Sequence, residues 1–170
     1  MQQPSHKEHK AQAKKSVVCA VITVSDTRTP ETDKSGILIK QHLEEQGHTL
    51  FAYHIIKDDP EQISPLLDEL IAQEGLDAVI INGGTGVARR DVTFDVVSRK
   101  VEKTLPGFGE LFRHFSYDEI GSAAMMSRAM AGTVGFKVIF SVPGSSAAVK
   151  LAMEKLILPE MPHVVFELRK

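Results

Sequence analysis

The regular alternation of short apolar runs with helix-patterned segments is the feature that most limits how this chain can fold. The run "VVCAVITV", residues 17–24, is continuous and rich in β-branched side chains, which is typical of a strand buried on both faces. Three further runs, at 49–56, 77–82 and 137–142, predict strands. Strands separated by helices predict parallel βαβ units joined by right-handed crossovers. We therefore expect an α/β domain built on a parallel sheet.

The segments between these runs predict helices. Gly47 fits the end of the first helix, and Asp59, followed by proline, fits the start of the second. Pro65 would make that second helix begin or kink near Ser64 instead. The segment 163–168 predicts an edge strand or a terminal segment packed on a neighbour. The residues with a helical pattern are 37–47, 57–75, 92–105, 106–121, 122–132 and 147–161.

Length, charge and composition narrow the class of protein. A chain of 170 residues has the size of one domain, which we place at 16–170, after a polar, flexible tail at 1–15. The net charge of -2 argues against nucleic acid as a partner. The N-terminus lacks the apolar segment of a secretory signal, and no apolar run approaches the length of a membrane span. We expect a cytoplasmic protein. Any anionic ligand must bind through a local site, because the molecule as a whole carries no net positive charge that would attract it.

The cysteine and histidine content gives no sign of a metal centre. Cys19 is the single cysteine, which excludes an intrachain disulfide and a multi-cysteine metal site. Because Cys19 lies within an apolar run, we expect it to be a buried hydrophobic residue and not a nucleophile. His6 and His9 lie in the polar tail, and the other five histidines are scattered without close pairing, so the sequence shows no zinc constellation.

Three loops should meet at one edge of the predicted sheet. Ligands of parallel α/β sheets bind in the crevice at the carboxyl ends of the strands. Three of the predicted strands are followed by the loops Ser25–Gly36, Asn82–Asp91 and Pro143–Ser146. The remaining strand, at 49–56, is followed by Asp58. We therefore expect any functional site to be built from these four segments.

The glycine-rich sequence "GGTG", residues 83–86, is suited to binding a phosphate group. Its glycines allow backbone N–H groups to converge on an anion, and Thr85 adds a hydroxyl. It matches neither the Walker A loop nor the dinucleotide-binding fingerprint, and a plain turn between strand and helix explains it equally well. "PGSS", residues 143–146, has the same two interpretations, as an anion-binding loop or as ordinary helix capping.

Asp58 and Asp91 are the carboxylates at this edge with the strongest claim to a chemical role. Either could hold Mg²⁺ or orient a phosphoryl group, and Arg90 could offset developing negative charge. Either could instead only cap a helix, as we expect of Asp59. Spacing alone leaves both alternatives open.

Six motifs in this order resemble the molybdenum cofactor biosynthesis family MoaB/MogA. The resemblance covers about 17–158, and the segment "SYDEIGSAAMMSRAMAG" is more similar to the MoaB branch. The motifs are "VSDTR…DKSG", "KDD", "GGTGVARRDVT", "PGFGELFR", "MMSRAMAG" and "VPGSSAAV".

The resemblance implies a three-layer α/β/α domain with a mostly parallel sheet that binds molybdopterin. It also implies adenylylation of the molybdopterin phosphate by Mg²⁺ and ATP, with release of pyrophosphate. ATP is the expected nucleotide and GTP the alternative. The "SDTR" loop, Ser127 and Arg128 are further candidates for the site. The residues implied by the resemblance are Asp58 and Asp91 for catalysis and metal binding, and Ser25, Asp26, Gly83, Gly84, Thr85, Gly86, Arg90, Pro143, Gly144, Ser145 and Ser146 around the ligands.

Two positions depart from the pattern of the family. Phe94 stands where many active members have proline, and Asn82 stands where Thr or Ser often precedes the glycines. These departures leave a non-catalytic carrier of molybdopterin or nucleotide as the alternative function. The resemblance further implies a homo-oligomer, a trimer or a hexamer, and the apolar residues of "MMSRAMAG" and "GELFRHF" could pack between subunits.

Overall fold

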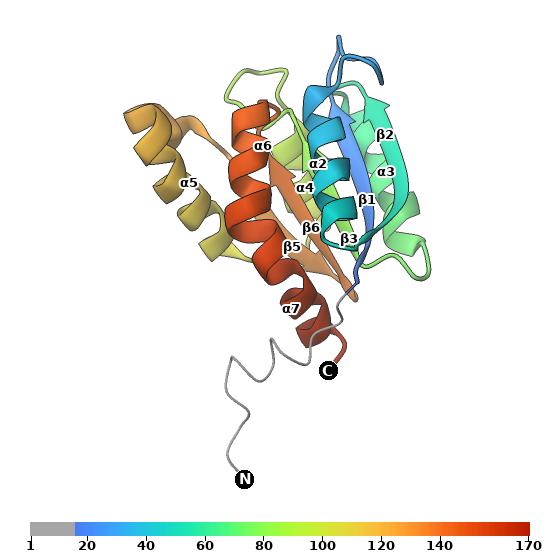
Figure 1. Cartoon of the computed structure of the whole chain (residues 1–170). Helices are drawn as coiled ribbons and strands as arrows, with labels where there is room; N and C mark the ends of the chain where they lie inside the picture. The colour runs from blue at the N-terminus through green and yellow to red at the C-terminus, as the bar shows by residue number, and fades with distance from the viewer. Residues whose placement is uncertain (1–15) are drawn as a thin grey trace, which may run out of the picture.

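A six-stranded sheet with the order β2-β1-β3-β6-β5-β4 forms the middle layer of the molecule (Figure 1). The computed structural model describes residues 16–170, so the tail expected at 1–15 lies outside the described residues. Four neighbouring strands are parallel, whereas β5 is antiparallel to both of its neighbours, which confirms a mostly parallel sheet. The strands are β1 (Val18–Val24), β2 (Thr49–Ile56), β3 (Ala78–Asn82), β4 (Lys103–Thr104), β5 (Met130–Val134) and β6 (Lys137–Val142).

Helices cover both faces of the sheet, which confirms the three-layer architecture. Alternate residues of β1 enter different cores: Cys19 and Val21 pack on one face, and Ala20 and Ile22 on the other. The first face is covered by α2 (Lys34–Glu45), α5 (Pro106–Ile120), α6 (Ser146–Ala152) and α7 (Leu158–Leu168), and the second by α3 (Pro60–Ala72) and α4 (Thr93–Lys100).

The register of the parallel strands brings their carboxyl ends to one level. Val24 of β1 pairs with Ile56 of β2, and Asn82 of β3 pairs with Val142 of β6. The loops after β1 and β3 and the start of α6 therefore lie together at the upper edge in Figure 1. This is the edge where the sequence predicted a site.

Several local predictions are confirmed. Asp59 caps α3 by accepting a hydrogen bond from the amide of Glu61 at 2.9 Å. Gly47 follows the end of α2 with a positive φ of 72°. Cys19 is fully buried, and burial, with the nearby charge of Asp77, raises the pKa of its thiol to about 12. A thiol in this state is not a nucleophile at neutral pH.

The predicted start of this helix near Ser64 is wrong. Helix α3 runs from Pro60 through Pro65 to Ala72. Pro65 is exposed, so the Glu61 carbonyl that loses a helical hydrogen bond there can be hydrated. No helix among residues 16–170 is both long and apolar enough to cross a membrane.

The helices predicted at 92–105 and 122–132 are partly wrong. Helix α4 ends at Lys100, and the short strand β4 follows it. Residues Gly121–Met126 form a 3₁₀ helix, and β5 then pairs with β6. Gly135, at a φ of 53°, makes the tight hairpin turn between β5 and β6 possible, a signal that the helical pattern of the methionines concealed.

The C-terminal segment 163–168 is helical, so the predicted edge strand is wrong, whereas the alternative, a terminal segment packed on a neighbour, agrees with its packing on the core. It belongs to α7, which continues α6 through one π-helical turn at Met153–Ile157. Met161 and Val165 are four residues apart and are both buried in the core on that face of the sheet. Burial against its own sheet gives the segment its helical structure.

Candidate functional site

Two cavities lie side by side at the carboxyl edge of the sheet and share Gly84. The first, here called the polar cavity, has a volume of about 210 Å³ and is lined by Val24, Ser25, Asp26, Thr27, Asp58, Gly84, Arg90 and Asp91. The second, the apolar cavity, has a volume of about 330 Å³ and is lined by Gly84, Thr85, Gly86, Phe112, Ser116, Glu119, Ile120, Met126, Ser127, Pro143, Gly144, Ser145, Ala147 and Ala148.

Asp58 links the end of β2 to the start of α4. Its carboxylate accepts hydrogen bonds from the amide of Val92 and the hydroxyl of Thr93, both at 3.2 Å. Asp58 therefore caps a helix from another segment while it also faces the polar cavity. Burial and the charges of Asp91 and Asp26 raise its pKa, and the two hydrogen bonds only partly offset this.

Asp91 closes a turn and does not cap α4. Its carboxylate accepts a hydrogen bond from the amide of Ala88 at 2.9 Å, whereas the N-cap position of α4 is Val92. The carboxylate also faces the polar cavity, with the exposed Arg90 beside it. The backbone of the loop after β3 thus presents a carboxylate and a guanidinium at one opening.

The glycines of this loop are required by close contacts. Gly84 has a φ of 65°, and a Cβ atom there would lie 2.6 Å from a carboxylate oxygen of Asp58. A Cβ atom on Gly86 would lie 2.5 Å from a carboxylate oxygen of Asp91. Gly83 packs on the carbonyl of Val24 and lines neither cavity. The glycines therefore let the backbone pass against both aspartates.

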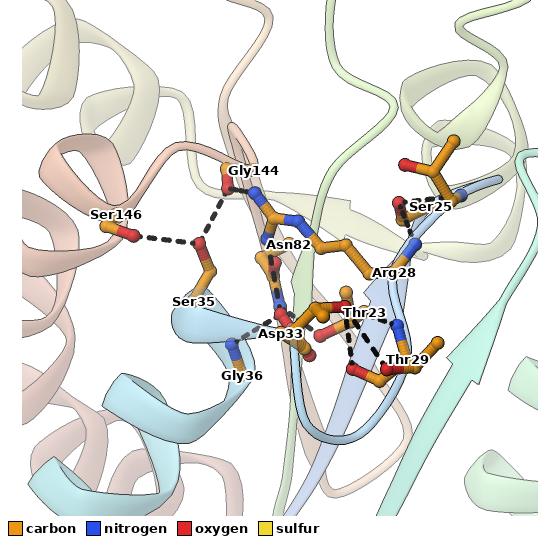
Figure 2. A network of polar contacts seen from close by, with 12 residues as sticks. Thr23, Ser25, Arg28, Thr29, Asp33, Ser35, Gly36, Asn82, Gly144 and Ser146 are labelled. Carbon is orange, nitrogen blue, oxygen red and sulfur yellow. Dashed lines mark hydrogen bonds and ion pairs between the residues drawn. The ribbon is translucent and has the colours of Figure 1, made fainter.

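The loop 143–146 is held by the loop after β1 and by the first turn of α2, as Figure 2 shows. Arg28 and Ser35 donate hydrogen bonds to the carbonyl of Gly144, at 3.0 and 2.7 Å. Ser145 caps α6 by accepting from the amide of Ala148 at 3.2 Å, which confirms the capping interpretation of this loop. The Ser146 hydroxyl lies 3.5 Å from that of Ser35 and lines neither cavity.

Asp33 is the buried centre of this connection (Figure 2). It caps α2 by accepting from the amide of Gly36 at 3.0 Å, and it accepts from Tyr53 at 2.5 Å and from Arg28 at 3.2 Å. Burial alone would raise its pKa, but the hydrogen bonds from Thr23, Tyr53, Gly36 and Arg28 together lower it. The ionised carboxylate thus holds Arg28 in place over Gly144.

Arg128 holds the loop after β3 from its other side. It donates to the carbonyl of Gly86 at 2.9 Å and to the carbonyl of Asp91 at 2.7 Å, and it pairs with Asp95 at 3.1 Å. Its guanidinium lies 4.9 Å from the ring centroid of Phe94. Phe94 therefore supports the arginine that fixes this loop.

The structure brings most of the predicted site residues together around the two cavities, with Gly83 and Ser146 just outside them. Sequence reasoning missed the wall that α5 contributes to the apolar cavity. Phe112, Ser116 and Glu119 lie on one face of that helix. Their spacing of four and three residues was a signal, but the helix was read only as core or subunit interface.

The polar cavity offers oxygen ligands for a divalent cation without forming a closed cage. Asp26, Asp58 and Asp91 line it, yet residues 16–170 contain no group of three or more acidic, histidine or cysteine side chains close enough to hold a metal ion by themselves. Mg²⁺ is commonly bound by one or two carboxylates together with water and substrate phosphates. The residues present fit that mode.

These features define a class of protein: a three-layer α/β domain with its ligand site at the carboxyl edge of a mostly parallel sheet. The family described as "Probable molybdopterin binding domain" matches residues 20–163, and the chain belongs to this family.

Relatives over nearly the whole length agree with this assignment. A molybdenum cofactor biosynthesis protein B of Bacillus anthracis is 56% identical over 96% of this chain and 97% of its own. A crystal structure of a molybdenum cofactor biosynthesis protein B is 55% identical, covers 93% of this chain and 99% of its own, and has a TM-score of 0.89. That of a tungsten cofactor synthesizing protein MoaB from Pyrococcus furiosus is 38% identical, covers 93% and 100%, and has a TM-score of 0.82.

Proposed function

We propose that this chain acts in molybdenum cofactor biosynthesis, where it binds molybdopterin and adenylylates its phosphate with Mg²⁺ and ATP, releasing pyrophosphate. The observation that carries the proposal is the pair of cavities that meet at Gly84. A transfer between two phosphate-bearing ligands needs two neighbouring compartments with one shared wall that both phosphates can reach. The description of the family supplies the pterin, and the names of the relatives supply the pathway.

The shapes and polarities of the cavities suggest which ligand each would take. The apolar cavity, with Phe112, Ile120 and Met126 on its walls, suits the flat pterin ring. The polar cavity, with Asp58, Asp91 and Arg90, suits the phosphates of the nucleotide. The pterin phosphate would then lie at Gly84, between the two.

The proposed reaction requires positioning and charge compensation more than covalent help. An oxygen of the pterin phosphate attacks the α-phosphorus of ATP, the bond from that phosphorus to the bridging oxygen of the β-phosphate breaks, and pyrophosphate leaves. Asp58 and Asp91 would hold Mg²⁺, which when bound neutralises phosphate charge. Arg90 would offset the charge that develops on the leaving group.

A carrier that binds molybdopterin or nucleotide without turnover is the second candidate. The observation that favours it is Phe94, which stands where the family resemblance implies proline and whose ring centroid lies 4.9 Å from the guanidinium of Arg128. A loop held this firmly could bind a phosphate without rearranging for transfer. The two candidates differ in whether Asp91 matters for rate or only for binding.

Replacing Asp91 with asparagine separates enzyme from carrier. If the chain is an enzyme, D91N should lower the rate of pyrophosphate release with molybdopterin, ATP and Mg²⁺ by at least about a hundredfold. Molybdopterin affinity should stay within about threefold, because the side-chain oxygen of the new asparagine can still accept from Ala88 and close the turn. Pyrophosphate and adenylylated pterin are both measured. Tight binding without product in the unaltered protein would establish the carrier.

The raised pKa of Asp58 predicts an unusual pH dependence of cation binding. The ionised carboxylate binds Mg²⁺, so affinity should fall on acidification at a higher pH than for an ordinary aspartate, whose pKa is about 3.9. Titration calorimetry with Mg²⁺ and ATP from neutral pH down to about pH 3.5, just below the ordinary aspartate pKa, measures this fall. The D58N variant should bind weakly at every pH and remain folded, since a raised native pKa means that the ionised form is disfavoured in the fold. A midpoint at or below that of an exposed aspartate contradicts the assignment.

We also propose a homo-oligomer, a trimer or a hexamer, in the cytoplasm, where ATP is available. The support comes from exposed apolar side chains on α5 and the 3₁₀ turn after it that lie outside the apolar cavity: Leu111, Tyr117 and Met125. Met130 and Phe112, from the motifs that suggested a subunit interface, are core residues. Light scattering gives the molar mass in solution and distinguishes monomer, trimer and hexamer.

A further inference from the structure

Among the described residues 16–170, Glu119 is the one ionisable side chain on the wall of the apolar cavity. It lies near the carboxyl end of α5, which reaches the same upper edge of the molecule as the loop after β3 and the start of α6 (Figure 1). The rest of the lining is glycine, proline, hydroxyl and apolar side chains. Glu119 is an exposed residue of α5, and it is the one charge beside a lining that is otherwise neutral and partly apolar.

The hydroxyl groups of the cavity are mostly committed to the protein itself. Ser116 donates to the carbonyl of Phe112 at 2.7 Å, Ser145 accepts from Ala148 at 3.2 Å, and Ser127 accepts from the amide of Ala129 at 3.3 Å. The side chain of Glu119 makes neither a hydrogen bond nor an ion pair with any residue of 16–170. It is therefore the strongest acceptor that the cavity leaves for a ligand.

From this geometry we propose that Glu119 is the specificity residue for the pterin ring, an inference that rests on the proposed function. The pyrimidine edge of a pterin presents two adjacent donors, the ring N3–H and the 2-amino group. A carboxylate accepts both at once, in the paired geometry that guanidinium groups also use. The ring faces would pack on Ile120 and Met126 beside it.

The charge of Glu119 also orients the ligand. A carboxylate repels phosphate, so the phosphate is favoured at the glycine loop, where Gly84 and Gly86 line the cavity without a side chain. With its donor edge at Glu119, the pterin points its phosphate toward Gly84 and the polar cavity. Glu119 thus selects the pterin ring and directs the pterin phosphate toward Gly84, where the two cavities meet.

The test compares a pterin that carries a phosphate on its C6 side chain with the matching lumazine, in which oxygen replaces the 2-amino group. The unaltered protein should bind the pterin at least tenfold more tightly than the lumazine. In E119Q, pterin affinity should fall roughly tenfold to a hundredfold, as expected when a hydrogen bond to a charged group is lost. The preference over lumazine should shrink to about threefold or less. Fluorescence titration measures all four dissociation constants.

A control variant separates recognition from charge and folding. D118N makes the same charge change at the next position of α5, outside the cavity lining, and should keep both affinities and the preference. If E119Q keeps the tenfold preference, the inference about Glu119 is overturned while the proposed function stands. If the unaltered protein binds neither compound, the proposed function and this inference fall together.

Discussion

Replacing Asp33 with alanine should lower the free energy of unfolding by about 3–5 kcal/mol, the range for breaking a buried ionic and hydrogen-bonded group. Asp33 is fully buried and accepts from the amide of Gly36, from Tyr53 and from Arg28. Alanine removes the cap of α2 and leaves the Tyr53 hydroxyl without its acceptor. Urea unfolding followed by circular dichroism measures the loss.

Asp59 provides the matched control. It is also an aspartate at the N-cap of a helix, but its side chain accepts only from the amide of Glu61 among the described residues. D59A should therefore cost about 1 kcal/mol, the ordinary value of a cap. The difference in unfolding free energy between D33A and D59A measures what the buried hydrogen bonds of Asp33 to Tyr53 and Arg28 contribute beyond a helix cap. Equal losses would mean that Asp33 is only a cap.

The stability that Asp33 contributes to the folded protein should depend on pH. Because the pKa of Asp33 is lowered in the folded protein, its ionised form stabilises the fold. That contribution is fully present above the unfolded pKa, about 3.9, and is lost as the pH falls through the lower folded pKa. The stability gap between D33A and the unaltered protein should therefore narrow on acidification below about pH 4.

The sequence predicted the edge of the sheet at which the site lies, because four strands and the loops that follow them were visible in it. Continuous β-branched runs mark buried parallel strands, and the register of those strands then puts Asp58, Gly84 and Gly144 at one level. The antiparallel strands β4 and β5 were missed. The first has only two residues, and the second contains Met130, Ala131 and Gly132, which carry little strand preference.

Partners across long distances in sequence could not be predicted. The hydrogen bond that caps α4 joins Asp58 to Val92, 34 positions away in the sequence. The hydrogen bond from Arg28 to the carbonyl of Gly144 spans 116 positions. Each depends on where a side chain points after folding, which spacing does not encode. For the same reason the sequence left both roles of Asp58 open, and the structure shows that its carboxylate caps a helix while it also faces a cavity.

Gly84→Ala should abolish transfer while leaving a folded protein. A Cβ atom at this position meets the hydroxyl of Thr93 and lies 2.6 and 2.8 Å from the two carboxylate oxygens of Asp58, so Asp58 must move. Displacement of a positioning group by about 1 Å can cost about a hundredfold in rate, and we expect at least that loss of pyrophosphate release. Cation affinity should fall in parallel, because the same carboxylate faces the polar cavity.

Gly75 separates this steric effect from backbone strain. Its φ of 79° resembles the 65° of Gly84, but nothing lies within 4 Å of a Cβ atom built there, and it lines neither cavity of the site. Both alanine variants should lose about 1–2 kcal/mol of stability from the left-handed backbone alone. Only G84A should also lose transfer and cation binding, since only there does the new methyl group displace the Asp58 carboxylate from the wall of the polar cavity. Full activity in G84A would show that the contact between Gly84 and Asp58 does not position the reacting groups, and the proposed role of that shared wall would be wrong.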